Sequence, residues 1–229
     1  MAAIIEKLAG WLARSSRRPG RPGRLSKRRI RGFLPADAVI IEAGAHVGHD
    51  TVELSRLWPE GRIHAFEPLP DLFATLKART GDRPNVRCYP LALGGTSGRV
   101  EFNVSSGTSD ASSSILAPKQ HLEQHPEVTF DRTIVVEAIT IDDWAQRQGV
   151  PRVDFLWLDL QGYELFTLKS AGTILPAVRA IYTEVYLKES YRGVPLYPEV
   201  RDWLGRRGFT VEWEGLPWPD AGNVLFVRR

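Results

Sequence analysis

The chain has 229 residues, of which 43% are hydrophobic and 25% are charged, and Cys88 is its one cysteine. This length suits one folded domain with a large core, and no apolar run approaches the roughly 18 residues of a membrane-spanning helix. A single cysteine excludes an intramolecular disulfide and a cysteine-rich zinc site, so we expect a globular protein of the reducing cytoplasm.

Basic residues are concentrated at the start of the chain. Residues 1–31 hold ten Lys or Arg and one Glu, which leaves 20 basic and 26 acidic residues in the rest. The stretch "RSSRRPGRPGRLSKRRIR" has few side chains to bury, so we predict a basic, flexible arm over residues 1–35 and one domain over 36–229. Such an arm is typical of a solvated tail, but it also fits nucleic acid, an anionic membrane surface or a targeting peptide.

From residue 36 short apolar runs alternate with helical periodicity, the pattern of a parallel sheet covered by helices. The continuous apolar run "AVIIEAG" predicts a buried first strand. Further strands are predicted at "RIHAFEP", "VRCYPLAL", "VDFLWLDL" and "VRAIYTEVY", and helices at "GHDTVELSRLWPEG", "LPDLFATLKART", "TIDDWAQRQG", "YELFTLKSAG" and "LYPEVRDWLGRRG". The final "FTVEWEG" and "AGNVLFVRR" are expected to form an antiparallel hairpin. The predicted fold class is α/β, a Rossmann-like, doubly wound and mostly parallel sheet.

Between about residues 94 and 136 this alternation is interrupted. "GRVEFNVSSGTSDASSSIL" predicts a strand that continues into a Ser-rich loop, and "TIVVEAIT" predicts another strand. A loop of this length is typical of a functional or disordered segment rather than of a simple connection.

The stretch "EAGAHVGHD" after the first strand carries Gly44 and Gly48. In a doubly wound sheet ligands bind at the carboxyl ends of the strands, where glycines let the backbone turn sharply and approach a ligand. Glu67 ends the second strand, where an acidic side chain can accept hydrogen bonds from both ribose hydroxyls. The turn and Glu67 together predict a ligand that contains a nucleoside.

Two cofactors fit this arrangement. NAD requires a glycine in the middle of the turn, where this chain has His46. S-adenosylmethionine has no phosphate and tolerates a looser turn, with Glu42 available for its ammonium group, so we expect S-adenosylmethionine. The structural alternatives are that Glu42 caps backbone groups and that Glu67 is a surface charge at a strand end.

The glycine turn, the "FEP" that ends the second strand and the "DLQGYE" after "VDFLWL" resemble the FkbM family of class I S-adenosylmethionine-dependent methyltransferases. The similarity covers about residues 38–185. It implies a class I methyltransferase fold and O-methylation of a sugar or of a polyketide-like natural product. The resemblance further implies cofactor contacts at Glu42, Gly44, Ala45, His46, Gly48, Glu67, Pro68, Ala92, Leu93, Ser113, Asp159 and Gln161.

The sequence departs from the family pattern in three places. E-A-G-A-H stands where the family usually has D-x-G-A-N, Trp157 stands in place of a Lys, and Gln161 stands in place of a Glu. One charge of each sign is thus lost. We expect cofactor binding to be retained, whereas acceptor choice and metal dependence stay open.

Methyl transfer to oxygen needs a base for the hydroxyl proton, which typically contributes about 10²–10⁴-fold in rate. Asp159 is the first candidate, because a carboxylate at the end of a hydrophobic strand is costly unless partners or a function hold it there. Glu164 and Glu184 are further catalytic candidates, and for Glu164 the alternative is a cap of the turn. Neighbouring carboxylates also suit a divalent cation, but we expect no metal, and the five histidines show no ligand spacing.

The sequence therefore predicts an O-methyltransferase with a small-molecule hydroxyl acceptor. Two alternatives stay open: a nucleic-acid methyltransferase that uses the basic arm, and a binding protein that keeps the fold without turnover. No aromatic platform for single-stranded nucleic acid accompanies the arm, which favours a small molecule. Trp203, Trp213 and Trp218 are interpreted as packing residues, or as a surface on which a sugar ring stacks.

Overall fold

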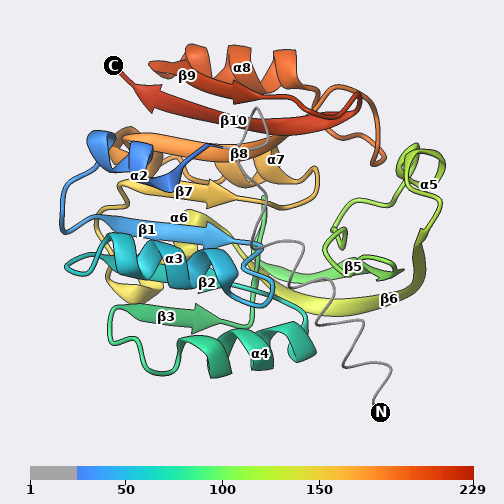
Figure 1. The fold of residues 1–229 in the computed structure, drawn as a ribbon, viewed down its shortest axis with the longest axis horizontal. Coiled ribbons are helices and arrows are strands. Elements are labelled where there is room, and N and C mark those ends of the chain that lie inside the picture. Colours follow the sequence, from blue (N-terminus) through green and yellow to red (C-terminus); the bar gives the residue numbers. More distant parts are fainter. Residues whose placement is uncertain (1–24) are drawn as a thin grey trace.

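A computed structural model describes residues 25–229 as two sheets with helices packed around them (Figure 1). The larger sheet has seven strands in the spatial order β3 (Val86–Tyr89), β2 (Arg62–Phe66), β1 (Val39–Ala43), β7 (Phe155–Leu158), β8 (Ala180–Tyr186), β10 (Ala221–Arg228) and β9 (Phe209–Gly215). The smaller sheet has the order β4 (Ala92–Leu93), β6 (Val128–Ile139) and β5 (Gly98–Gly107).

The larger sheet confirms the predicted α/β class. Strands β3, β2, β1, β7 and β8 run parallel, and β10 pairs antiparallel with both β8 and β9. The chain winds outward from β1 through β2 to β3 and then returns to the other side of β1 with β7 and β8. The direction of winding thus reverses between β1 and β7, the place where ligands bind in open α/β sheets.

Five helices follow the predicted segments with differences at their ends, whereas the helix at Lys27–Ile30 lies in the predicted flexible arm and the helix at His121–Gln124 lies where no helix was predicted. The helices are α2 (Lys27–Ile30), α3 (His49–Leu57), α4 (Pro70–Thr80), α5 (His121–Gln124), α6 (Ile141–Gln148), α7 (Glu164–Lys169) and α8 (Tyr197–Gly205), with 3₁₀ turns η1 (Arg31–Phe33) and η2 (Leu175–Ala177). Local chemistry sets several boundaries: the Thr140 hydroxyl accepts the Asp143 N–H at the start of α6, and Gly149 ends that helix at φ 62°.

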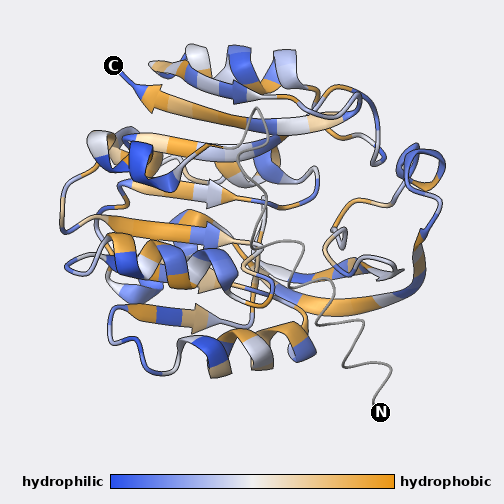
Figure 2. Cartoon of the chain, in the orientation of Figure 1, coloured by the Kyte–Doolittle hydropathy of each residue, from blue (hydrophilic) through white to orange (hydrophobic). Residues whose placement is uncertain are grey.

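The first strand is buried on both faces. Val39 and Ile41 enter a cluster with side chains of α6, α7 and α8, whereas Ile40 packs with Ile30 and Trp58 on the other face. Figure 2 shows the central strands mostly in hydrophobic colours. Burial on both faces explains why the sequence of this strand does not alternate.

Two expectations need correction. The predicted arm reached residue 35, but Leu25, Lys27 and Ile30 are buried against the body, and only residues 1–24 lie outside the described residues. The segment "VRCYPLAL" is not one strand: β3 and β4 belong to different sheets, separated at Pro90, which has no N–H for a continuous ladder. Within residues 25–229, no helix is long and apolar enough to cross a membrane.

Candidate active site

A pocket opens at the carboxyl ends of β1, β2 and β7. Its open space is about 630 Å³, counting the part that is continuous with solvent. The turn after β1, the ends of β2 and β7, strand β5 and the Ser-rich loop all contribute walls. The residues that line it are Gly44, His46, Phe66, Glu67, Pro68, Leu69, Leu72, Leu91, Ala92, Leu93, Phe102, Asp110, Ala111, Ser113, Ile115, Asp159, Leu160, Gln161 and Tyr163.

One wall of the pocket is apolar. The predicted cofactor residues Pro68, Ala92 and Leu93 are part of it, together with Leu72 of α4 and Phe102 of β5. Ala92 and Leu93 are held there because β4 pairs with β6 in the smaller sheet. An apolar wall of this kind suits an aromatic base such as adenine.

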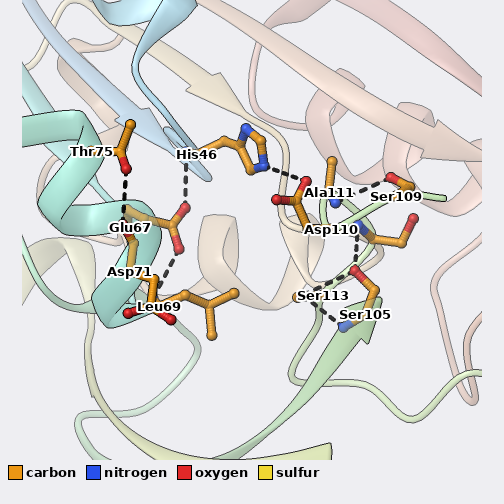
Figure 3. Close-up of polar contacts among 11 residues, drawn as sticks. His46, Glu67, Leu69, Asp71, Thr75, Ser105, Ser109, Asp110, Ala111 and Ser113 are labelled. Carbon is orange, nitrogen blue, oxygen red and sulfur yellow. Dashed lines mark hydrogen bonds and ion pairs between the residues drawn. The ribbon is translucent and has the colours of Figure 1, made fainter. Parts of the chain in front are cut away.

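Glu67 lies next to this wall at the end of β2 and is 5% exposed. Its Oε2 accepts the backbone N–H of His46 and its Oε1 accepts that of Leu69, both at 2.9 Å (Figure 3). Burial raises the pKa of the carboxyl, and the two N–H groups oppose this shift. Each oxygen keeps a second lone pair, so Glu67 can still accept hydroxyl hydrogens from a ligand.

His46 connects the turn after β1 to the Ser-rich loop. Its Nε2 lies 2.8 Å from Oδ1 of Asp110 (Figure 3), and its backbone has φ 50°, a left-handed conformation uncommon for a residue with a side chain. The sequence analysis missed Asp110, although its position in a long polar loop beside "SSS" was a usable signal. The contact brings the loop to the edge of the pocket.

The two glycines of the turn have left-handed backbones, at φ 79° and 83°, as the predicted sharp turn requires, and they have a second role in packing. A Cβ on Gly44, at φ 79°, would lie 1.9 Å from the carbonyl oxygen of Asp159, and one on Gly48 would lie 2.7 Å from Cδ1 of Leu76. Both positions therefore make room for protein atoms, although Gly44 also lines the pocket. Gly44 lets β1 and β7 approach closely, and Gly48 lets α3 pack against α4.

Two other predicted residues of the turn are buried beside the pocket. Ala45, 4% exposed, packs against Ala65 and Leu76. Glu42 is 1% exposed, and its Oε2 has no hydrogen-bond partner within the described part of the chain. Burial, followed by the charge of Asp50, raises the pKa of Glu42 to about 8. Neither side chain is part of the pocket wall, so the predicted contact of Glu42 with an ammonium group stays a prediction.

Asp159 and Gln161, which line the pocket, belong to a hydrogen-bonded network that continues behind the lining to the predicted catalytic Glu184 and to Tyr186 and Tyr191. The Gln161 Nε2 donates to Oδ1 of Asp159 at 2.7 Å and to Oε2 of Glu184 at 2.8 Å, and its Oε1 accepts the Tyr191 hydroxyl at 3.0 Å. The Tyr186 hydroxyl also donates to Oε2 of Glu184, at 2.6 Å. The network thus joins the end of β7 to the end of β8. It contains two of the three predicted catalytic carboxylates, and also Tyr191, which the sequence analysis missed.

The two carboxylates of this network differ in their surroundings. Asp159 faces the open space of the pocket; the surrounding protein atoms raise its pKa, and the hydrogen bond from Gln161 opposes this. Burial, reinforced by the negative charge of Asp159, raises the pKa of Glu184 well above its ordinary value. Both carboxyls therefore have raised pKa values, and Asp159 is the one of the two that lines the pocket.

Glu164 has a different environment from the other two candidates. It is 3% exposed, and its Oε1 accepts the N–H of Leu160 at 2.8 Å and that of Gly162 at 3.3 Å. Burial raises its pKa to about 8. These contacts support the alternative interpretation of Glu164 as a cap of the turn between β7 and α7, since its side chain does not line the pocket.

The Ser-rich loop is anchored to this network. The Ser114 hydroxyl donates to the backbone carbonyl of Gln161 at 2.8 Å, and the Tyr191 hydroxyl donates to that of Ser112 at 2.8 Å. Ser113, which lines the pocket, accepts the N–H of Ser105 at 2.9 Å (Figure 3). The loop is therefore part of the site, as its length and composition predict.

The charges that line the pocket distinguish between the two cofactors considered, a dinucleotide and S-adenosylmethionine. Glu67, Asp110 and Asp159 line it, and neither Lys nor Arg does within residues 25–229. Such walls repel a diphosphate and attract a cation. An apolar slot, a carboxylate with free lone pairs beside it and acidic walls fit S-adenosylmethionine, which carries a positive sulfonium, better than a dinucleotide.

Comparison with known proteins gives the same indication. The family model described as the methyltransferase FkbM domain matches residues 42–211. The 2-O-methyltransferase NoeI of Sinorhizobium fredii is 34% identical over 162 residues, which are 69% of this chain and 67% of that protein. The hexuronic acid methyltransferase AglP of Haloferax volcanii is 26% identical over 152 residues, 66% of this chain and 56% of that protein.

The fold is also similar to solved structures. An rRNA methylase from Streptococcus thermophilus matches with a TM-score of 0.52 and 14% sequence identity, over 93% of this chain and 99% of that chain. At this identity the match shows the fold, which is the class I methyltransferase fold.

Proposed function

Since this chain belongs to the FkbM methyltransferase family, we propose that it transfers the methyl group of S-adenosylmethionine to a hydroxyl of a sugar or natural product. It is an S-adenosylmethionine-dependent methyltransferase; the class of the acceptor is the proposal. The observation that carries it is Asp159, an acidic group that lines the pocket directly after β7. Relatives named as a 2-O-methyltransferase and a hexuronic acid methyltransferase support an oxygen acceptor on a sugar.

We assign the cofactor contacts by chemistry. The apolar wall with Ala92 and Leu93 takes the adenine, and the free lone pairs of Glu67 accept the ribose hydroxyls. Gly44 and His46 form the turn next to the methionine end. When bound, S-adenosylmethionine supplies a methyl group attached to a positively charged sulfur, and this sulfur is a good leaving group.

The chain itself contributes position and a base. Asp159 takes the proton of the acceptor hydroxyl, so that the oxygen becomes nucleophilic. Gln161 fixes the orientation of the Asp159 carboxylate, and a pKa raised from its ordinary value brings Asp159 closer to the working pH, where a general base is most effective. Glu184, which accepts hydrogen bonds from Gln161 and Tyr186, holds Gln161 in place behind the base.

Asp159→Asn tests this assignment, because it keeps the shape of the side chain and removes the base. We expect turnover to fall by about 10²–10⁴-fold, while the affinity for S-adenosylhomocysteine, measured by calorimetry, changes by less than about threefold, well under the tenfold that 1.4 kcal/mol represents. Glu60→Gln is the matched control, because Glu60 is exposed and precedes β2, at the end of that strand away from the pocket. Transfer from labelled S-adenosylmethionine to a panel of glycosides gives the rates, and full activity of Asp159→Asn would exclude Asp159 as the base.

A further inference from the structure

Gln161 is held in an unusual conformation beside the proposed base. Its backbone has φ 51°, a left-handed conformation that a residue with a side chain keeps only where its surroundings hold it there. The Ser114 hydroxyl donates to its backbone carbonyl at 2.8 Å. Its side chain lines the pocket and donates to Asp159 at 2.7 Å. The neighbours of Gln161 therefore decide which end of its amide meets the base.

The amide of Gln161 can lie two ways round, because its oxygen and its nitrogen have nearly the same size. In the structure its NH₂ group donates to Oδ1 of Asp159 and to Oε2 of Glu184. With the amide reversed, its oxygen would face the ionised Asp159 carboxylate, which has only acceptor atoms. Within the described part of the chain, Oδ2 of Asp159 has no hydrogen-bond partner, so this oxygen is available to the acceptor hydroxyl.

The Tyr191 hydroxyl lies on the other side of this amide. Tyr191 is 0% exposed, and its ring packs at nearly right angles against the rings of Phe130 and Tyr186. Its hydroxyl shares one hydrogen between Oε1 of Gln161, at 3.0 Å, and the carbonyl oxygen of Ser112, at 2.8 Å. Because the ring is enclosed, the hydroxyl stays beside the amide oxygen.

We propose that Tyr191 is a positioning residue for methyl transfer: its hydroxyl keeps the oxygen of the Gln161 amide turned away from Asp159, so that the NH₂ group stays on that carboxylate. This inference rests on the proposed function, in which Asp159 is the base. It adds a residue that does not itself line the pocket. Since the same hydroxyl also bonds Ser112, the Ser-rich loop and the base share one anchor.

Removal of the Tyr191 hydroxyl should raise the pKa of Asp159. The hydrogen bond from Gln161 lowers that pKa, and an amide that is free to turn supplies this bond for only part of the time. The loss of one hydrogen bond corresponds to roughly half to one pKa unit. Besides Tyr191, four other titratable groups interact electrostatically with Asp159 and are the same in every variant below: Asp50, His46, Glu164 and Glu184.

Carbon NMR measures this pKa directly on the full chain in the presence of S-adenosylhomocysteine. Protein that carries ¹³C-labelled aspartate is titrated, and the Asp159 carboxyl signal is identified by its loss in Asp159→Asn. We expect Tyr191→Phe, which keeps the buried ring, to raise the pKa by roughly half to one unit. Gln161→Met, which removes the amide, should raise it at least as much, and Tyr191→Phe should add nothing in that background. Tyr197→Phe is the control: this tyrosine is 6% exposed, its hydroxyl bonds Glu214 on β9, and its loss should leave the titration unchanged.

An unchanged pKa of Asp159 in Tyr191→Phe or in Gln161→Met would overturn the proposal, and so would a rise that persists in full when both substitutions are combined. The acidic limb of the pH–rate profile on the glycoside panel should move by the same amount, while the KM for S-adenosylmethionine changes by less than about threefold. A raised pKa without transfer to any glycoside keeps the role of Tyr191 and removes the proposed function. Transfer with an unmoved pKa keeps the function and removes the role of Tyr191.

Discussion

The buried carboxyl of Glu42 predicts a specific dependence of folding stability on pH. Glu42 is 1% exposed, and burial raises its pKa from 4.5 to about 8. The folded protein therefore keeps a proton on Glu42 at pH values where the unfolded chain has lost it. Its contribution to stability is complete below about pH 4.5 and is lost as the pH rises toward 8.

The size of the effect follows from the shift in pKa. One pKa unit corresponds to about 1.36 kcal/mol, so the rise from 4.5 to about 8 amounts to a loss on the order of 5 kcal/mol between these limits. Glu42→Gln keeps the size of the side chain and cannot ionise. We expect the variant to be more stable than the wild type by several kcal/mol at pH 8, with the difference shrinking as the pH falls to 5.

Urea unfolding at pH 5, 6, 7 and 8 measures this difference directly. Glu164, whose pKa is also raised to about 8, contributes a slope of the same sign and is present in both proteins, so it cancels in the comparison. Glu60→Gln at an exposed position serves as the control and should follow the wild type. Curves for wild type and Glu42→Gln that run parallel over this range would refute the assignment of a buried proton to Glu42.

Three substitutions test the pocket. Glu67→Ala should weaken S-adenosylmethionine binding about tenfold or more in calorimetry and lower the melting temperature, because it also leaves two backbone N–H groups without acceptors; unchanged affinity would exclude the ribose contact. Gly44→Ala should destabilise the fold by several kcal/mol in denaturant titration, because its Cβ would lie 1.9 Å from the carbonyl oxygen of Asp159. Gln161→Glu places a third carboxyl between Asp159 and Glu184, and its negative charge should raise the pKa of Asp159 and move the acidic limb of the pH–rate profile to higher pH. The three carboxyls should also bind Mg²⁺, which calorimetry would detect. A pH–rate profile identical to that of the wild type would show that Gln161 has no influence on the base.

The larger sheet could be predicted because its signals are local. Each buried strand is a short apolar run, each helix has its own period, and a parallel pair needs a helix between its strands. The smaller sheet could not be predicted in this way, since β4 pairs with β6 through Ala92 and Ala138, which lie far apart in the sequence. Pairing of this kind depends on tertiary contacts, and the apolar residues of "VRCYPLAL" carry no mark of where the strand breaks except Pro90.

The positions of the predicted site residues followed from the strand ends, but their partners did not. Glu67 and Asp159 lie in the pocket because parallel strands end at the same edge of the sheet. The loss of a positive charge at Trp157 was read from the sequence, yet Lys27 places its Nζ 4.7 Å from the centre of the Trp157 ring. Nothing in the local sequence relates two residues so far apart, and only the packing of α2 on the sheet brings them together.

The ion pairs of Lys27 are also relevant to whether the basic segment binds nucleic acid. Its side chain is 4% exposed, and its ammonium group pairs with Asp50 at 2.5 Å and Glu53 at 2.6 Å, while Arg29 pairs with Glu212 at 2.7 Å. Within the described part of the chain, these two cations are already neutralised by acids of the body. The pocket is lined by three carboxylates and, within residues 25–229, by neither Lys nor Arg, a charge that repels a phosphate backbone. A polyanion would therefore have to bring its target base past like charges, whereas an uncharged hydroxyl acceptor meets no such barrier, and for this reason the geometry of the site favours a small molecule.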